Sequence, residues 1–389
     1  MSVFRNLLMQ STGWLGKPAD WSDIRKDCPK NSIALYAGVK SDYSAYDNLG
    51  FTATCVGGYK VYIDETLYGT YNSGAQCNIT WSTSGITTGD DITTPSALKA
   101  HKIWIEPATE GNNITAFRCN RVAASGNEYQ GVLWAHFNIT NTINIGSCFG
   151  NPNTYRNNML KAITSKNNLL SVSQLSNAFQ YSSSLQYTPV FLGYSSYVNA
   201  TSAFQINNII PNISFKDIEI RYVNNAFNNC NYLEKIKTSN SFFNLGSDCS
   251  NAFYNCYRLK TPIMVDFNYA NATNMTDFMR NCSAIEDMTL DVRAASGLTK
   301  IGCYGSSQYF MSGFKGLHVS NEAPFDNANA PQINVSYTGL DRAALVQLFN
   351  DLPSVSGGQI INVLGATGAS DLTSADEAIA TAKGWTITK

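Results

Sequence analysis

The sequence predicts an α+β multidomain protein, in which a small antiparallel β domain precedes an α/β solenoid with a carboxy-terminal cap. Three observations predict it: β-rich runs punctuated by glycines, a motif that recurs from about residue 176 onward, and a closing helix–strand pattern. The expected parts are an amino-terminal docking segment at 1–46, a sandwich-like β domain at 47–149, the solenoid at 150–337 and the cap at 338–389.

The composition favours a folded protein with an uncharged polar surface. Of the 389 residues, 44% are hydrophobic, which is enough to bury a core. Charged residues make up 14%, well below the usual quarter, and Asn, Ser, Thr, Gly and Tyr take their place. Such residues build binding surfaces from hydrogen bonds and aromatic rings.

The charge pattern argues against nucleic acid and membranes as partners. The net charge is -1, and 27 basic residues are scattered among 28 acidic ones, whereas phosphate binding needs clustered Lys and Arg. No apolar run reaches the 18 residues that span a bilayer, and the first residues lack the long apolar stretch of a signal peptide. We therefore expect assembly in the cytoplasm without a signal peptide.

The sequence before residue 150 predicts mainly β-strands. The leading segment mixes aromatic and charged residues without periodicity, and we expect it to dock onto a larger assembly. Strands of an antiparallel sandwich are expected at 59–64, 66–71, 100–105, 114–121 and 132–139.

A heptapeptide motif of Phe, then Cys three residues later, then Leu three residues after that, recurs along the second half. Its copies begin at 179, 204, 227, 253 and 279, at intervals of 25, 23, 26 and 26 residues. The first two copies carry Ser182 and Asn207 in place of Cys, and a sixth copy is expected at Met311, Phe314 and Leu317. The residues predicted to form the repeat core are Phe179, Leu185, Phe227, Cys230, Leu233, Phe253, Cys256, Leu259 and Cys282.

Spacing by three places the motif residues on one face of a short helix or 3₁₀ turn, with the preceding Ser-Asn as its N-cap. Strands are expected after the Leu, at 187–192, 234–237, 261–265 and 287–292. Stacked units then bury what one unit cannot, with the cysteines as an internal ladder. The cap is expected to contain a helix at 340–352, a strand at 359–364, a helix at 374–383 opened by a capping box, and a strand at 385–388.

Sequence motifs for catalysis are missing. There is no Gly-x-Ser-x-Gly, His-Glu-x-x-His or phosphate-binding Gly-x-x-x-x-Gly-Lys, and ten cysteines and three histidines form no zinc pattern. We therefore expect no enzyme, no catalytic residue, no metal and no cofactor, and we interpret the cysteines as small buried hydrophobes. A glycan-cleaving enzyme with two carboxylates remains an alternative.

The strand face of the solenoid is the predicted ligand-binding surface. Residues between the buried positions of each strand should point outward, and as a set they are polar with few charges, as a glycan or a protein loop requires. A merely solvated face is the alternative. The predicted ligand-binding residues are Tyr187, Asn212, Lys235, Lys237, Thr261, Asp287 and Thr289.

The unit Ser-Asn-Ala-Phe-x-x-Cys-x-x-Leu-x-x-Ile, repeated over about residues 176–320, resembles the BspA-type leucine-rich repeat. That resemblance implies a curved leucine-rich-repeat-like solenoid that binds proteins or glycans at cell surfaces. The order of the modules, with the closing segment 372–387, is similar to that of phage tail-fibre and receptor-binding proteins.

These resemblances imply a phage virion adhesion protein. Its amino-terminal segment would dock on other virion structural proteins, its repeats would bind a host cell-surface glycan or protein, and a homotrimer would be in keeping with a fibre. A bacterial BspA-like surface adhesin and a capsid (head) decoration protein are the alternatives.

Overall fold

The computed structural model describes residues 16–42, 46–94, 96–119, 131–151, 155–156, 159–193, 197–260, 266–303, 313–325 and 331–389. The chain is mostly β and contains a β-solenoid of about nine turns. It divides into two compact units. Unit 1 spans residues 1–198 and 206–218, and unit 2 spans residues 199–205 and 219–389.

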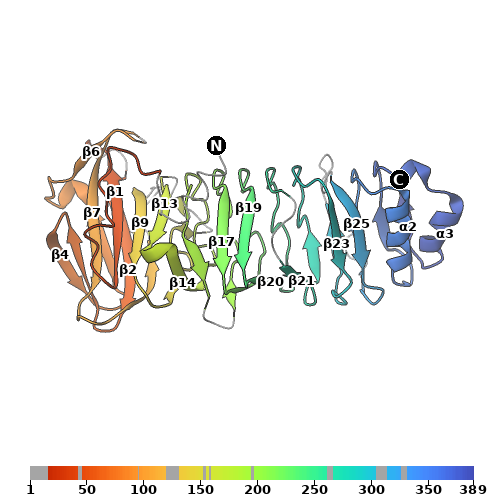
Figure 1. Cartoon of the computed structure of the whole chain (residues 1–389), viewed down its shortest axis with the longest axis horizontal. Coiled ribbons are helices and arrows are strands. Elements are labelled where there is room, and N and C mark those ends of the chain that lie inside the picture. Colours follow the sequence, from red (N-terminus) through yellow and green to blue (C-terminus); the bar gives the residue numbers. More distant parts are fainter. Residues whose placement is uncertain are drawn as a thin grey trace. The chain divides into compact units, whose positions relative to one another are not determined.

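The first sheet of unit 1, sheet A, has the order β13-β9-β1-β7-β3-β4, with β6 also paired to β7 (Figure 1). All its strand pairs are antiparallel except that of β13 with β9. Its strands are β1 (Ser32–Val39), β3 (Tyr59–Ile63), β4 (Thr66–Tyr71), β6 (Asp90–Ile92), β7 (Leu98–Pro107), β9 (Val132–Asn138) and β13 (Ala162–Ser165).

The second sheet, sheet B, changes from antiparallel to parallel along its width. Within unit 1 its order is β17-β15-β14-β10-β8-β2-β5. The pairs between β8 and β17 are all parallel. Its strands are β2 (Asn48–Cys55), β5 (Gln76–Thr80), β8 (Ile114–Arg118), β10 (Ile143–Asn144), β14 (Leu169–Gln174), β15 (Val190–Leu192) and β17 (Asn212–Lys216). The shorter elements are η1 (Trp81–Thr83), β11 (Gly150–Asn151), β12 (Tyr155–Arg156), η2 (Lys166–Asn168) and β16 (Val198–Asn199).

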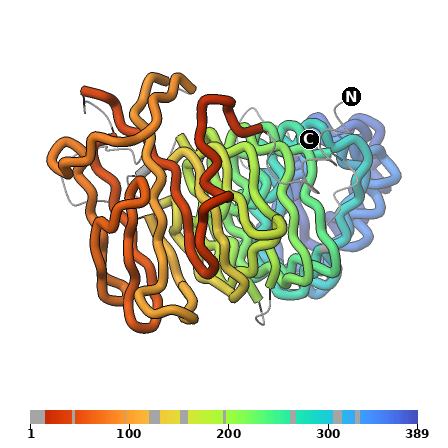
Figure 2. Tube along the Cα trace, turned by 60° about the vertical axis from the view of Figure 1, so that its left-hand side comes forward, coloured from red at the N-terminus to blue at the C-terminus, as the bar shows by residue number. Residues whose placement is uncertain are grey.

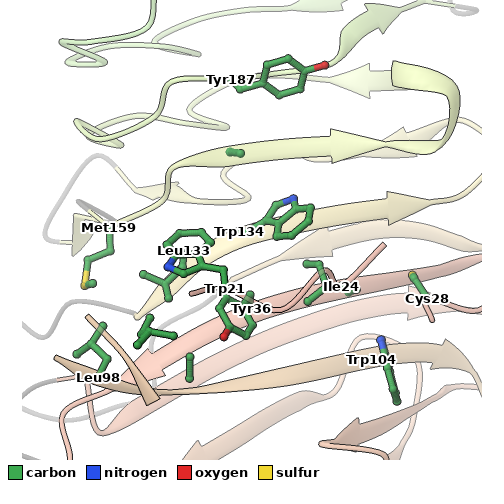
Figure 3. Packing of buried hydrophobic residues seen from close by; sticks show 14 residues of the cluster. Trp21, Ile24, Cys28, Tyr36, Leu98, Trp104, Leu133, Trp134, Met159 and Tyr187 are labelled. Atoms are coloured by element: carbon green, nitrogen blue, oxygen red, sulfur yellow. The ribbon is translucent and has the colours of Figure 1, made fainter. Parts of the chain in front are cut away.

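Both faces of sheet A are covered around its central strand β1. On one face Phe137 packs edge-on against Phe117 of sheet B, with ring centroids 6.2 Å apart. On the other face lies part of the leading segment, where Trp21 stands 5.6 Å from Tyr36 and joins a cluster with Trp134 (Figure 3). All eight residues of β1 are consequently buried. The sequence did not predict this strand, because burial on both faces removes the alternation that marks a strand.

Unit 2 is built mostly from short parallel strands, which follow one another in chain order as stacked loops of the Cα trace (Figure 2). One sheet has the order β18-β20-β21, a second β22-β24-β26-β27-β28, and a third pairs β23 with β25. Its strands are β18 (Glu219–Arg221), β19 (Lys235–Ser239), β20 (Phe242–Asn244), β21 (Asp266–Asn268), β22 (Asn274–Thr276), β23 (Met288–Val292), β24 (Lys300–Gly302), β25 (Phe314–Val319), β26 (Ile333–Asn334), β27 (Ile360–Asn362) and β28 (Thr386–Thr388).

The repeated motif forms a turn whose backbone alternates between two kinds of hydrogen bond. The amides of Phe227 and Asn229 donate to the carbonyls of Ala252 and Tyr254 in the next coil, at 2.8 and 2.7 Å. The amide of Cys230 instead donates within its own coil, to the carbonyl of Phe227 at 3.0 Å. The turn is therefore held both within its own coil and to the coil that follows.

The sequence predicts a short helix or a 3₁₀ turn at the motif; no helix forms there, and the hydrogen bonds between residues three apart belong to separate turns. Two positions in each turn, four residues apart, adopt left-handed backbone angles, and asparagine fills both of them in two copies: φ is 53° at Asn225 and 60° at Asn229, and 55° and 60° at Asn251 and Asn255. A left-handed residue turns the chain out of a right-handed helix, and Asn tolerates it better than other residues with a side chain. The Ser-Asn that seemed to be an N-cap instead supplies the first left-handed position.

All nine residues predicted for the repeat core are buried. The rings of Phe204, Phe227 and Phe253 stack in sequence, with centroids 5.7 and 5.2 Å apart. Each motif cysteine donates its thiol to the Phe carbonyl of the preceding coil: Cys230, Cys256 and Cys282 donate to Phe204, Phe227 and Phe253, each at 3.1 Å.

The copies without cysteine show what this position requires. In unit 1, Asn207 donates its side-chain amide to the carbonyl of Phe179 at 2.7 Å, the bond that cysteine makes in the later copies. Four copies therefore share a side-chain hydrogen bond to the buried Phe carbonyl, whereas Ser182 of the first copy is buried without a hydrogen-bond partner for its hydroxyl. The expected sixth copy is not a motif turn in its described part, because Phe314 and Leu317 lie in β25.

The cap agrees with its sequence. Helices α2 (Arg342–Asp351) and α3 (Ser374–Thr381) are the α-helices of the described residues, with η3 (Ala369–Asp371) between them (Figure 1). Thr373 and Asp376 form the capping box at the start of α3. Both helices confirm the corresponding expectations, apart from a few end residues. The same holds for ten strands: β3, β4, β7, β8, β9, β15, β19, β23, β27 and β28. The strand expected at 261–265 lies outside the described residues.

Asn255 offers a test of the left-handed turn. Both Asn255→Gly and Asn255→Ala remove its side-chain hydrogen bonds to Asn229 and Asn281. Alanine also meets the strain of a positive φ, so we expect it to lower the free energy of unfolding by about 0.5–1 kcal/mol more than glycine does, after allowance for the greater unfolded-state entropy of glycine. Denaturant unfolding of both variants measures this, and a helical turn would reverse the order because alanine is the better helix former.

Candidate functional site

The histidine of unit 1 that has an acidic partner is enclosed. His101 is 2% exposed, its Nδ1 lies 2.8 Å from Oδ2 of Asp64, and its ring stacks on Trp81 at 4.3 Å. Burial acts to raise the pKa of Asp64, but hydrogen bonds from His101, from the Lys102 amide and from Thr88 outweigh it and lower that pKa. The pair is a satisfied structural contact that a substrate does not reach.

The other two histidines have different surroundings. Burial lowers the pKa of His136 to about 4, so its ring is neutral near pH 7, where it shares a 2.9 Å hydrogen bond with Thr164. His318 is partly exposed on β25, and its Nδ1 lies 2.7 Å from Oδ2 of Asp351 at the end of α2. Neither ring lies beside a serine or cysteine nucleophile in any contact that the described residues make.

The cysteines are free thiols held away from solvent. Nine of the ten are buried and Cys119 is half-buried. Burial raises the pKa of Cys77 to about 11 and that of Cys249 to about 12, and it also raises the pKa of Cys256 well above its usual value. Neutral buried thiols are poor nucleophiles and poor metal ligands. Within the described ranges, no three His, Cys, Asp or Glu side chains gather closely enough to hold a metal ion.

These thiols should be inert in the folded protein. Burial raises the pKa of Cys256 and Cys282 above that of a free thiol, so their thiolate fraction at pH 8 is far smaller than in the unfolded chain, and Cys230 is fully buried. We expect iodoacetamide at pH 8 to leave Cys230, Cys256 and Cys282 unlabelled until denaturant is added, after which all ten cysteines react. Peptide mass mapping reads this out, and rapid labelling of the three motif cysteines without denaturant would contradict the buried ladder.

The residues predicted for ligand binding occupy separate places. Lys235, Asp287 and Thr289 are exposed, Asn212 and Lys237 are half-buried, and Thr261 lies outside the described residues. Asp287 immediately precedes β23, and Thr289 lies on the outer side of that strand, where the next outward residue, Asp291, is in register with His318. Lys235 and Lys237 lie two apart on β19, with Ile236 buried between them. Asn212 belongs to unit 1, whereas Lys235, Lys237, Asp287 and Thr289 belong to unit 2.

Tyr187 corrects one of these expectations. It is 8% exposed and lies in the tryptophan cluster of unit 1, so its ring does not point outward (Figure 3). The reason is its pairing: the Tyr187 backbone bridges to Ala162 at the edge of sheet A, and its hydroxyl donates to the side chain of Asn168. Tyr187 is therefore a core residue.

A polar cavity of about 480 Å³ lies in unit 1. Lys60 and Glu106 face each other there as a cross-strand pair, and burial raises the pKa of Glu106 although Lys60 acts to lower it. No aromatic side chain lines the cavity. It therefore lacks the large flat contacts that dominate most binding sites.

The variable positions of the motif turns in unit 2 form a more distinctive surface. The two residues after each buried Cys, and the residue after the Phe or Met, vary between copies and include exposed side chains. Because successive coils are in register, equivalent residues stand in columns. We call the aromatic and arginine residues of these columns the turn surface: Tyr232, Tyr254, Tyr257, Arg258 and Arg280.

Two arginines of the turn surface lie on tyrosine rings of the preceding coil. The Arg258 guanidinium carbon is 3.9 Å from the ring centre of Tyr232, and that of Arg280 is 5.1 Å from the ring centre of Tyr254. Such cation–π contacts hold both partners and are worth about 0.5–1 kcal/mol when exposed. Tyr232 and Tyr257 are 46% and 42% exposed, which is high for tyrosine in this chain.

A ladder of asparagines runs beside these columns. The side-chain amide of Asn255 donates to Asn229, and that of Asn281 donates to Asn255, both at 2.7 Å. With the backbone bonds between coils, these contacts fix the positions from which the turn surface projects. A surface on a rigid scaffold loses little entropy on binding.

Sequence reasoning missed the turn surface because it considered the repeated positions of the motif and gave no role to the variable ones. The signal was present: Tyr232 and Arg258 occupy the same position of consecutive copies, and Tyr257 stands beside them. Those residue types are the ones enriched at the centres of interfaces.

No family model, curated protein or solved structure matches this chain. Among the residues that the structure describes, no helix has both the length and the apolar character to cross a bilayer.

Proposed function

We propose that this protein is an adhesion protein, of the tail-fibre or receptor-binding kind carried by phage virions, and that its solenoid binds a glycan or protein of the host cell surface. The observation that supports the proposal most directly is the turn surface. There, exposed tyrosines and arginines from consecutive coils stand in fixed columns over a hydrogen-bonded backbone.

The chemistry of the turn surface suits recognition. Tyrosine supplies a large contact area with only two rotatable side-chain bonds, arginine supplies a planar fork of donors, and the neighbouring asparagines and serines adapt their hydrogen bonds. Tyrosine and arginine carry a disproportionate share of binding energy in measured interfaces. In this proposal the repeats bind and do not catalyse a reaction.

The proposal also rests on the resemblance of the module order to that of phage tail-fibre proteins. A solenoid suits such a task because binding residues can change at the variable positions while the buried Phe, Cys and Leu stay the same. The predicted docking of the leading segment on other virion proteins belongs to the same proposal. Within that segment, residues 32–39 form β1, at the interior of sheet A.

Binding should depend on the two exposed tyrosines. We expect the double variant Tyr232→Ala/Tyr257→Ala to lose about tenfold or more in apparent affinity, because each ring is a large exposed contact. The measurement is binding of the fluorescently labelled full chain to a panel of bacterial cells and to a glycan array.

Tyr337→Ala is the matched control, since Tyr337 is also 42% exposed in unit 2 but lies in a later coil than the turn surface. Its affinity should equal that of the wild type. Circular dichroism melting of all variants shows whether the fold is kept. Equal losses in the double variant and the control, or no loss in either, would place binding away from the turn surface.

A further inference from the structure

Arg258 differs from most arginines of the described chain in having no acidic partner. Five others each contact an aspartate or glutamate, and Arg280 is one of them, 3.2 Å from Asp277. The five are Arg25, Arg221, Arg280, Arg293 and Arg342. Arg258 lies over the ring of Tyr232 instead and makes no ion pair with a described residue.

The ring beneath Arg258 leaves its donors unused. A guanidinium placed on an aromatic face uses its flat side for the contact, while its N–H groups point outward in the plane. At 3.9 Å from the ring centre, the group is held close to the ring and exposed to solvent. A planar fork of this kind matches a carboxylate or phosphate in bidentate geometry.

The positive charge of Arg258 is not compensated by the ion pairs of its neighbours, because in those pairs the acidic residues contact other basic residues. Lys260, two residues further along, has Glu234 at 3.8 Å, and Arg280 has Asp277. An anion arriving at Arg258 therefore does not have to displace an existing carboxylate. Tyr257, the residue next to Arg258 in the chain, is 42% exposed.

We propose that Tyr257 and Arg258 form a subsite for an acidic sugar. The apolar face of the sugar ring packs on Tyr257, and the carboxylate or phosphate of the sugar accepts two hydrogen bonds from Arg258. This inference rests on the proposed function, because it names the class of ligand that the turn surface selects: an anionic glycan.

The test is an array that pairs acidic glycans with neutral counterparts: oligogalacturonate with its methyl ester, sialyllactose with lactose, and a phosphorylated oligomannose with its unphosphorylated form. The full-length wild type should bind acidic members in preference to their neutral partners. Arg258→Gln should lose about tenfold to hundredfold, the usual range for one charge-assisted contact. Arg258→Lys, which keeps the charge but not the fork, should lose less.

Lys260→Gln is the matched control, because it also removes one positive charge, two residues after Arg258. The Lys260 side chain is more than half exposed. It should change affinity by less than about fivefold, as expected for an exposed ion. Whether the carboxylate pairs or the phosphate pair show the Arg258-dependent preference identifies the anion.

Three results would overturn the inference. They are equal binding to acidic and neutral members, equal losses in Arg258→Gln and Lys260→Gln, and no binding of the wild type to any glycan. Binding to neutral glycans that depends on Tyr257 but not on Arg258 would overturn the acidic ligand and leave the proposed function standing. Failure to bind any cell of the bacterial panel would instead count against the proposed function itself.

Discussion

The backbone hydrogen bonds between successive coils are the constraint on which unit 2 depends. In the two motif turns that carry paired asparagines, the amides of the Phe and of the second Asn point along the stack and donate to the next coil, at 2.7–2.9 Å for Phe227, Asn229, Phe253 and Asn255. A right-handed helix would turn these donors back onto its own chain. The left-handed backbone at two positions of each turn prevents this, and so it determines the fold of the repeat.

The remaining features follow from that constraint. Register between coils brings each Phe ring onto the next and places each motif thiol against the Phe carbonyl of the preceding coil. It also brings the variable positions into columns, which is why an arginine of one coil lies on a tyrosine of another. Sequence changes at these positions alter the surface without disturbing the core, and this separation makes the solenoid suitable for recognition.

The sequence predicted what depends on periodic burial and on local capping. The spacing of Phe, Cys and Leu located nine residues that are all buried, and Thr373 with Asp376 located the start of α3. It did not predict the conformation of the motif turn, because spacing by three fits a helix and a left-handed turn equally well. Tyr187 was misplaced because its pairing with Ala162, 25 residues away in the chain, is invisible locally.

Amide hydrogen exchange with residue-level mass spectrometry tests the central claim most directly. If the coils are joined as described, the amides of Phe227, Asn229, Phe253 and Asn255 are strongly protected, although they belong to turns without regular secondary structure. They should also lose protection together as denaturant separates the coils. Exchange of these four amides at the rate of an unstructured peptide would contradict the coil-to-coil ladder, and with it the fixed columns of the turn surface.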